Sequence, residues 1–148
     1  MRGGFNEQVI TRCDQMVALV SPRYFERLFC VYELATFIHR YHGGPLHRYL
    51  YKDLVLLSQR WRNVFEGDRL NEEELKPLRT FRCRDAKTRK PADRALLLAA
   101  IRKEWGSEEA FDAFVRAALP PILASNKRRF RKAMARLAGE RLGVAFGA

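Results

Sequence analysis

The sequence has few cysteines and no long hydrophobic run, and these two absences exclude several classes of protein. The three cysteines, Cys13, Cys30 and Cys83, form neither a Cys-x-x-Cys pair nor the even-numbered set of a disulfide-stabilised secreted domain. We therefore expect free thiols in a reducing compartment. No window approaches the roughly 18 apolar residues that a membrane span needs, and the N-terminus lacks the apolar region of a signal peptide. Together these absences predict a cytoplasmic protein.

Sequence motifs for cofactors and metals are also missing. The paired glycines at 3–4 and 43–44 lack the spacing of the dinucleotide-binding and P-loop motifs. The three histidines have no cysteines at the spacing of a structural zinc site. We therefore expect neither a bound metal nor a resident cofactor.

Positive charge is abundant and unevenly distributed. The formal net charge is +11, and hydrophobic residues make up 47% of the 148 residues, enough for the core of one domain. Residues 120–148 hold seven basic side chains and one acidic one. Such a segment attracts nucleic acid, anionic lipid or an acidic protein, although a solvated cationic helix face is the simpler interpretation. The predicted basic patch consists of Lys127, Arg128, Arg129, Arg131, Lys132 and Arg136.

The first half of the chain shows the pattern of a strand–helix–strand unit. Residues 16–20 are a continuous apolar run, which is typical of a strand buried on both faces, as in a parallel sheet. Pro22 ends this strand. Apolar residues recur at helical spacing within 28–41, the Gly-Gly-Pro at 43–45 stops the helix, and residues 54–57 form a second apolar run. We therefore predict two parallel strands joined by a right-handed helical crossover.

A polar stretch with little periodicity follows over residues 66–92. In it Asn71 precedes three glutamates, and this order predicts the N-cap and first turn of a short helix. Pro77 should end that helix, because proline lacks the backbone N–H that a helix interior needs. Residues 80–90 have the composition of a loop.

The remainder of the chain is predicted to be helical. One helix is expected from an N-cap at Asp93 to Trp105. The next is capped by Ser107, carries the clearest amphipathic pattern of the chain, and should end at the proline pair 120–121. A last helix is predicted over residues 122–141, which include the basic patch.

The junction between the first strand and its helix carries a longer motif. Residues 21–34 read S-P-R-Y-F-E-R-L-F-C-V-Y-E-L. Five positions match the pattern S-x-x-Y-x-x-S-x-W-C-x-x-E-L, namely Ser21, Tyr24, Cys30, Glu33 and Leu34. The segment therefore resembles the third strand and following helix of the TIR (Toll/interleukin-1 receptor) domain, over about residues 13–61. The resemblance implies a flavodoxin-like parallel-sheet core that is incomplete at its N-terminus.

This resemblance also implies a site. In TIR domains that cleave NAD the glutamate of the C-x-x-E-L element is catalytic, so Glu33 is nominated as a catalytic carboxylate with NAD as its substrate. A fixed carboxylate stabilises the positive charge that develops on the ribose as the bond to nicotinamide breaks. Ser21, Tyr24 and Cys30 are nominated as substrate-binding residues. The alternatives remain open that Glu33 only favours the helix dipole and that the other three are structural.

The sequence thus predicts an α/β fold in three segments. These are a partial TIR-like parallel-sheet core over 1–65, a polar linker or irregular segment over 66–92, and a helical C-terminal extension over 93–148. The resemblance implies intracellular signalling through association with other TIR-like domains or with a second copy of the chain. NAD hydrolysis by Glu33 is the first alternative. Binding of an acidic partner or nucleic acid through the basic patch is the second.

Overall fold

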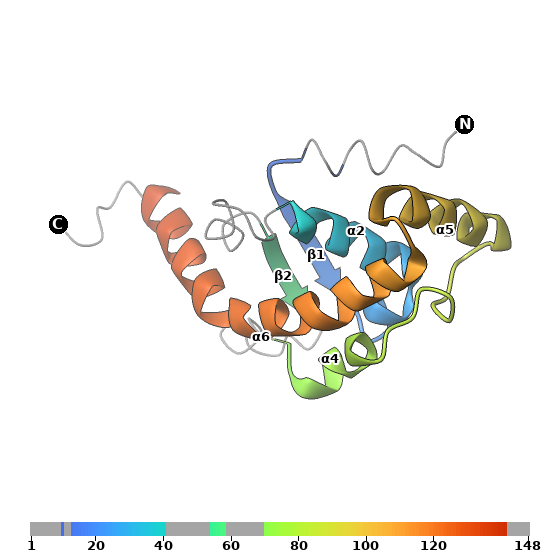
Figure 1. Ribbon diagram of the computed structural model, residues 1–148. Helices are drawn as coiled ribbons and strands as arrows, with labels where there is room; N and C mark the ends of the chain where they lie inside the picture. Colours follow the sequence, from blue (N-terminus) through green and yellow to red (C-terminus); the bar gives the residue numbers. More distant parts are fainter. Residues whose placement is uncertain (1–9, 11–12, 41–53, 59–69, 142–148) are drawn as a thin grey trace.

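The described part of the chain forms a two-stranded sheet with helices packed against it (Figure 1). The computed structural model describes residue 10 and residues 13–40, 54–58 and 70–141, with the backbone alone for 57–58 and 125–141. In chain order the elements are β1 (Met16–Val20), the short 3-10 helix η1 (Tyr24–Glu26), α2 (Leu28–His39), β2 (Leu54–Ser58), α4 (Glu72–Arg79), α5 (Pro91–Trp105) and α6 (Glu108–Arg141).

β1 and β2 lie side by side and run parallel, with Met16 paired to Leu54 and Val20 to Ser58. Both predicted strands, the helix that follows the first of them and the parallel direction are therefore confirmed, and the chain is an α/β protein. The Gly-Gly-Pro predicted to stop α2 lies outside the described residues. Within the ranges that the structure describes, no third strand joins the pair. The TIR-like character of this core stays a prediction.

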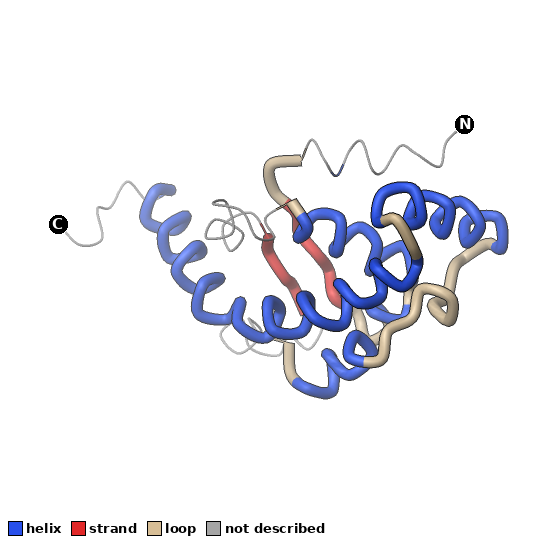
Figure 2. The backbone as a smooth tube through the Cα atoms, in the orientation of Figure 1, coloured by secondary structure: helices blue, strands red, loops and turns tan. Residues whose placement is uncertain are grey.

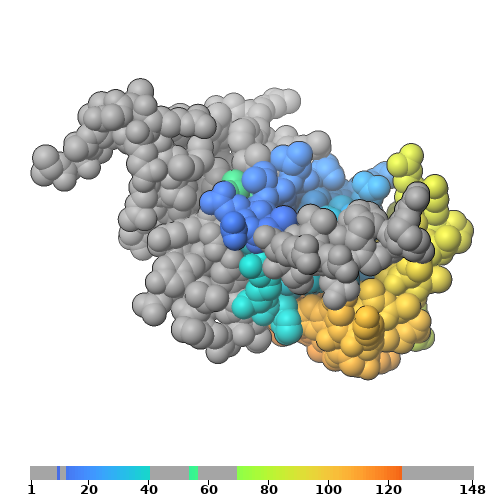
Figure 3. All heavy atoms as spheres, turned by 90° about the horizontal axis from the view of Figure 1, so that it is seen from above, coloured from blue at the N-terminus to red at the C-terminus, as the bar shows by residue number. Residues whose placement is uncertain are grey.

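One face of β1 is covered and the other is open. Ala18 and Val20 are 2% and 3% exposed, whereas Val17 and Leu19 are 57% and 66% exposed. The prediction that this strand is buried on both faces is therefore wrong. In Figure 2, α2 lies in front of β1, and α6 passes in front of the lower ends of both strands. Seen from above, the yellow and orange atoms of α5 and α6 lie opposite the blue atoms of the β1 region (Figure 3).

The covered face of the sheet and the helices share one hydrophobic core. The helical spacings expected from the sequence are confirmed by burial. Phe111 lies at the centre of an aromatic group, with its ring centroid 5.2 Å from Trp105 and 6.0 Å from Phe81. Core side chains that are at most 1% exposed include Leu28, Val31, Leu34, Phe37 and Ile38 of α2, Ile101 of α5, and Phe111, Val115, Leu119 and Leu123 of α6.

α4 begins where the sequence predicts and ends later. The Asn71 side chain accepts a hydrogen bond from the Glu74 N–H, and the Glu74 carboxylate accepts one from the Asn71 N–H, each at 2.9 Å. This capping box closes the helix N-terminus. Pro77 lies inside the helix instead of ending it. The backbone bond that the proline removes is offset by burial of Leu75 and Leu78, which are both 0% exposed.

Of the two N-caps predicted for α5 and α6, the first is wrong and the second is confirmed. α5 has Lys90 as its N-cap and Pro91 as its first residue, so the predicted N-cap at Asp93 is wrong. Proline suits this first position because the N–H that it lacks would have no helical partner there. Gly106 ends α5 with a φ of 84°. The Ser107 hydroxyl accepts a hydrogen bond from the Ala110 N–H at 3.0 Å, which caps α6 as predicted.

α6 continues through its proline pair. The predictions that one helix ends at 120–121 and that another begins at 122 are therefore wrong. Leu119, Pro120 and Leu123 are all buried, so the segment around the prolines is held against the core. Beyond this segment α6 curves away from the sheet in Figure 1, and proline is the usual cause of such a bend.

Candidate functional site

Glu33 lies in the second turn of α2, beside the core residues Val31 and Leu34. Its side chain is partly buried, and this loss of water raises the pKa of the carboxyl above the ordinary value of 4.5. The fold therefore disfavours the charged form of the residue that the TIR resemblance nominates as catalytic.

Tyr24 and Cys30 lie within electrostatic reach of Glu33. Burial is the main cause of the raised pKa at both Tyr24 and Cys30, and the charge of Glu33 adds to it at both. Arg27 partly opposes the increase at Cys30. Burial thus disfavours the charged form of all three groups, and Cys30 does not have the lowered pKa of an activated thiol.

Ser21 and Tyr24 are linked by the turn that leads into η1. The Tyr24 N–H donates to the Ser21 carbonyl at 3.0 Å. The Tyr24 ring is 8% exposed and meets Phe25 edge-on, with 5.2 Å between the ring centroids. Tyr24 is therefore a packed aromatic side chain, whereas Ser21 is partly exposed.

A hollow of about 540 Å³, here called the β1-end hollow, opens where β1 ends. Residues 21–23 and 26–27 form one wall, and residues 87–89 of the loop before α5 form the other. Backbone hydrogen bonds join the walls: the Leu28 N–H donates to the Lys87 carbonyl at 2.9 Å, and the Lys87 N–H donates to the Glu26 carbonyl at 2.8 Å.

The structure separates the nominated residues into two groups. Tyr24, Cys30 and Glu33 lie near one another but do not line the β1-end hollow, which Ser21 does. Sequence reasoning did not identify the wall at 87–89, because its only signal was the basic composition of a loop about sixty residues away along the chain. Catalysis by Glu33 and the use of NAD as a substrate stay predictions.

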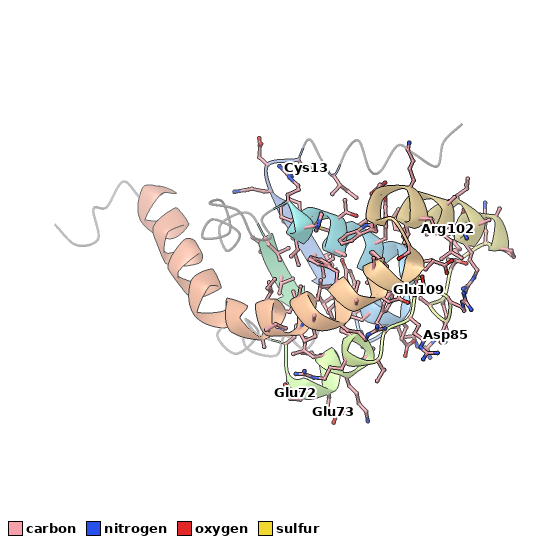
Figure 4. All side chains as sticks on the ribbon, in the orientation of Figure 1. Cys13, Glu72, Glu73, Asp85, Arg102 and Glu109 are labelled. Carbon is pink, nitrogen blue, oxygen red and sulfur yellow. The ribbon has the colours of Figure 1, made fainter. Side chains whose placement is uncertain are left out.

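A second hollow, of about 530 Å³, lies between the loop after α4 and the first turns of α6. Asp112 accepts the Cys83 N–H at 2.8 Å, and Arg116 donates to the Phe81 carbonyl at 2.8 Å. Cys83 is fully buried, and burial together with its hydrogen bond to Asp112 raises its pKa to about 12. Glu109, at the rim, is labelled in Figure 4. These bonds attach the loop to α6, so Asp112 and Arg116 already have structural partners.

Three further expectations concern metals, thiols and membranes. All three cysteines are free thiols, as predicted. In the part of the chain that the structure describes, no group of three or more His, Cys, Asp or Glu side chains could hold a metal ion. No helix found among these residues has the length and apolar character of a membrane span.

The predicted basic patch lies on the C-terminal part of α6, where the structure describes the backbone alone. The conformations of its side chains are thus outside the described residues. Its attraction to an acidic partner or nucleic acid stays a prediction.

Comparison with known proteins identifies no relative of this chain. No family model, curated protein or solved structure matches the chain. The TIR resemblance therefore depends on the motif over residues 21–34 and on the strand–helix–strand arrangement around it.

Proposed function

We propose that this chain is a TIR-like protein-association module that contacts its partner through the open face of its sheet. The motif over residues 21–34 and the parallel arrangement of β1 and β2 support the TIR-like part of the proposal. The exposure of Val17 and Leu19 is the observation that carries the association part.

The open face is defined by Val17 and Leu19 of β1 and by Val55 of β2. Val17 is paired with Val55 across the parallel ladder, so their side chains project from the same face of the sheet. β1 has the continuous apolar sequence of a strand that is covered on both sides, yet the described part of the chain covers one side. A group of exposed apolar side chains on a sheet is a typical protein contact surface.

A second copy of the chain is the partner that fits this face. Val17, Leu19 and Val55 carry no charge, so two copies related by a two-fold axis would place apolar side chains against each other. The first half of α6 packs on the opposite side of the sheet, and the half that contains the basic patch curves away from the sheet (Figure 1). The repulsion between the basic segments of the two copies is screened by salt.

The magnitude of the contact predicts a weak dimer. Burying the exposed parts of Val17 and Leu19 in both copies contributes roughly 1–2 kcal/mol for each side chain. Association costs about 4–15 kcal/mol in lost translational and rotational freedom. The four side chains together contribute about 4–8 kcal/mol, which exceeds the lower end of this cost by at most about 4 kcal/mol, so we expect self-association only at about 1 mM or above.

Light scattering and sedimentation over a concentration series test the proposal. We expect the mean mass of the wild-type chain to rise between about 0.1 and 3 mM, and Leu19→Lys to remain monomeric because it places a charge on the contact. Leu96→Lys is the matched control, because Leu96 is 54% exposed on α5, away from the open face. A wild-type monomer at every concentration, or equal disruption by both variants, would reject the proposal. Circular dichroism checks that each variant folds.

A further inference from the structure

We propose that the β1-end hollow binds a small molecule that carries a diphosphate group. Arg23 and Arg27 lie on one wall and Lys87 and Arg89 on the other, against the single carboxylate of Glu26. This site is separate from the open face of the sheet and does not depend on the association proposed above.

The cations of the hollow are poorly neutralised by the protein. Lys87 pairs with Glu26 at 3.9 Å, and both side chains are well exposed, so the pair is weak. Arg23, Arg27 and Arg89 form no ion pair with any residue that the structure describes. Like charges gathered around a concavity repel one another until an anion binds between them. The planar guanidinium group donates two parallel hydrogen bonds to phosphate oxygens, which suits it to this ligand.

The walls of the hollow are held in place before any ligand binds. The backbone of Lys87 is bonded on both sides, to Leu28 and to Glu26. Arg94 of α5 donates from its guanidinium to the carbonyls of Arg84 and Ala86, which fixes the loop that carries Lys87 and Arg89. A site with a fixed shape loses less conformational freedom when its ligand binds.

The place of the hollow in the fold adds to its attraction for anions. It lies at the carboxyl end of a parallel strand, which is where α/β proteins bind their ligands. The adjoining N-terminus of α2 has no acidic residue in its first turn, and its N-cap Arg27 makes no side-chain capping bond. The Leu28 N–H is bonded to the Lys87 carbonyl, but no acidic side chain in the first turn offsets the positive end of the helix dipole there.

The size of the hollow distinguishes a larger ligand from a single phosphate ion. Its volume of about 540 Å³ lies within the range of about 300–1,000 Å³ typical of small-molecule sites. Two cations on each wall match the two phosphate groups of a diphosphate, and the hydroxyls of Ser21 and Thr88 supply additional hydrogen-bond donors. A nucleoside diphosphate is a ligand of this class.

Isothermal titration calorimetry at constant ionic strength provides the first test. Inorganic pyrophosphate, ADP and adenosine are titrated into the full chain. We expect pyrophosphate and ADP to bind and adenosine not to bind, because the phosphates make the charged contacts. Failure of both phosphate compounds to bind, or binding of adenosine as tightly as ADP, would overturn the proposal.

Charge-matched variants provide the second test. The double variant Arg27→Gln/Arg89→Gln removes one cation from each wall and should weaken pyrophosphate binding roughly tenfold or more. The control Lys76→Gln/Lys103→Gln removes the same charge from exposed positions on α4 and α5, away from the hollow. We expect the control to bind within about twofold of the wild-type chain. Equal losses in both variants would show that overall charge, not the hollow, attracts the anion, and would overturn the assignment.

Discussion

At the scale of single residues, burial controls the chemistry of the motif. Loss of water raises the pKa of Glu33, Tyr24 and Cys30, so burial makes the charged form of each less favourable than it is in water. Stabilising an oxocarbenium-like transition state requires a charged carboxylate that contacts the substrate. Glu33 is partly buried and lines neither the β1-end hollow nor the hollow beside the loop after α4. Glu33 therefore has the position of a residue at the edge of the core.

The raised pKa of Glu33 predicts a pH-dependent cost to stability. Below the ordinary pKa of glutamate the carboxyl is protonated in both the folded and unfolded states, and there is no cost. As pH rises through the higher pKa of the folded state, ionisation destabilises the fold. We therefore expect Glu33→Gln to be more stable than the wild-type chain at pH 7. The difference should diminish at about pH 3.5, as measured by urea unfolding at both values.

Asp85→Asn is the control for this measurement, because Asp85 is an exposed carboxylate in the loop before α5 (Figure 4). We expect no comparable difference for this variant. A less stable Glu33→Gln at pH 7 would mean that the charged carboxylate makes a stabilising contact. The same Glu33→Gln protein tests catalysis, since nicotinamide release from NAD that survives the substitution would exclude a catalytic Glu33.

At the scale of elements, the sequence predicts where a helix begins when a nearby side chain caps it, and it predicts less well where a proline ends a helix. The caps at Asn71 and Ser107 depend on side chains that bond within three residues, so the sequence predicts them directly. Pro77 and the pair at 120–121 are compatible with helix because neighbouring side chains are buried in the core. That burial depends on distant elements, which a local pattern does not contain.

The turn between α5 and α6 gives a prediction at this scale. Gly106 has a φ of 84°, which side chains of L-residues rarely adopt, although a Cβ there would meet no atom within 4 Å. Gly106→Ala should therefore lower the free energy of unfolding by about 1 kcal/mol through backbone strain alone. Urea unfolding measures this loss, and the helix content by circular dichroism should not change. A change below about 0.3 kcal/mol would show that the turn relaxes to another conformation.

At the scale of the whole molecule, the two faces of the sheet differ: helices cover one face, and the other is open. The described helices bury Ala18 and Val20 and leave Val17 and Leu19 exposed. The cations of the β1-end hollow come from two segments that the fold brings together, one after β1 and one before α5. The two proposed surfaces therefore differ in kind, since one is apolar and the other is cationic.

This difference predicts opposite responses to salt. Between about 50 and 500 mM salt, self-association through the open face should persist or strengthen, because screening weakens the repulsion between chains of net charge +11. Pyrophosphate binding should weaken over the same range, because salt screens its attraction to the cations. Light scattering and calorimetry at both salt concentrations measure these effects. Dissociation of the assembled chain at high salt would indicate a charged contact surface instead.

The sequence by itself determined the two strands, their direction, the main helical spacings and the caps at Asn71 and Ser107, because each depends on the order of neighbouring residues. It also located the motif over residues 21–34. The tertiary structure decided which face of β1 is covered, whether prolines interrupt α4 and α6, and which cations meet at the end of β1. These outcomes depend on packing between segments far apart in the chain, where burial outweighs local preference.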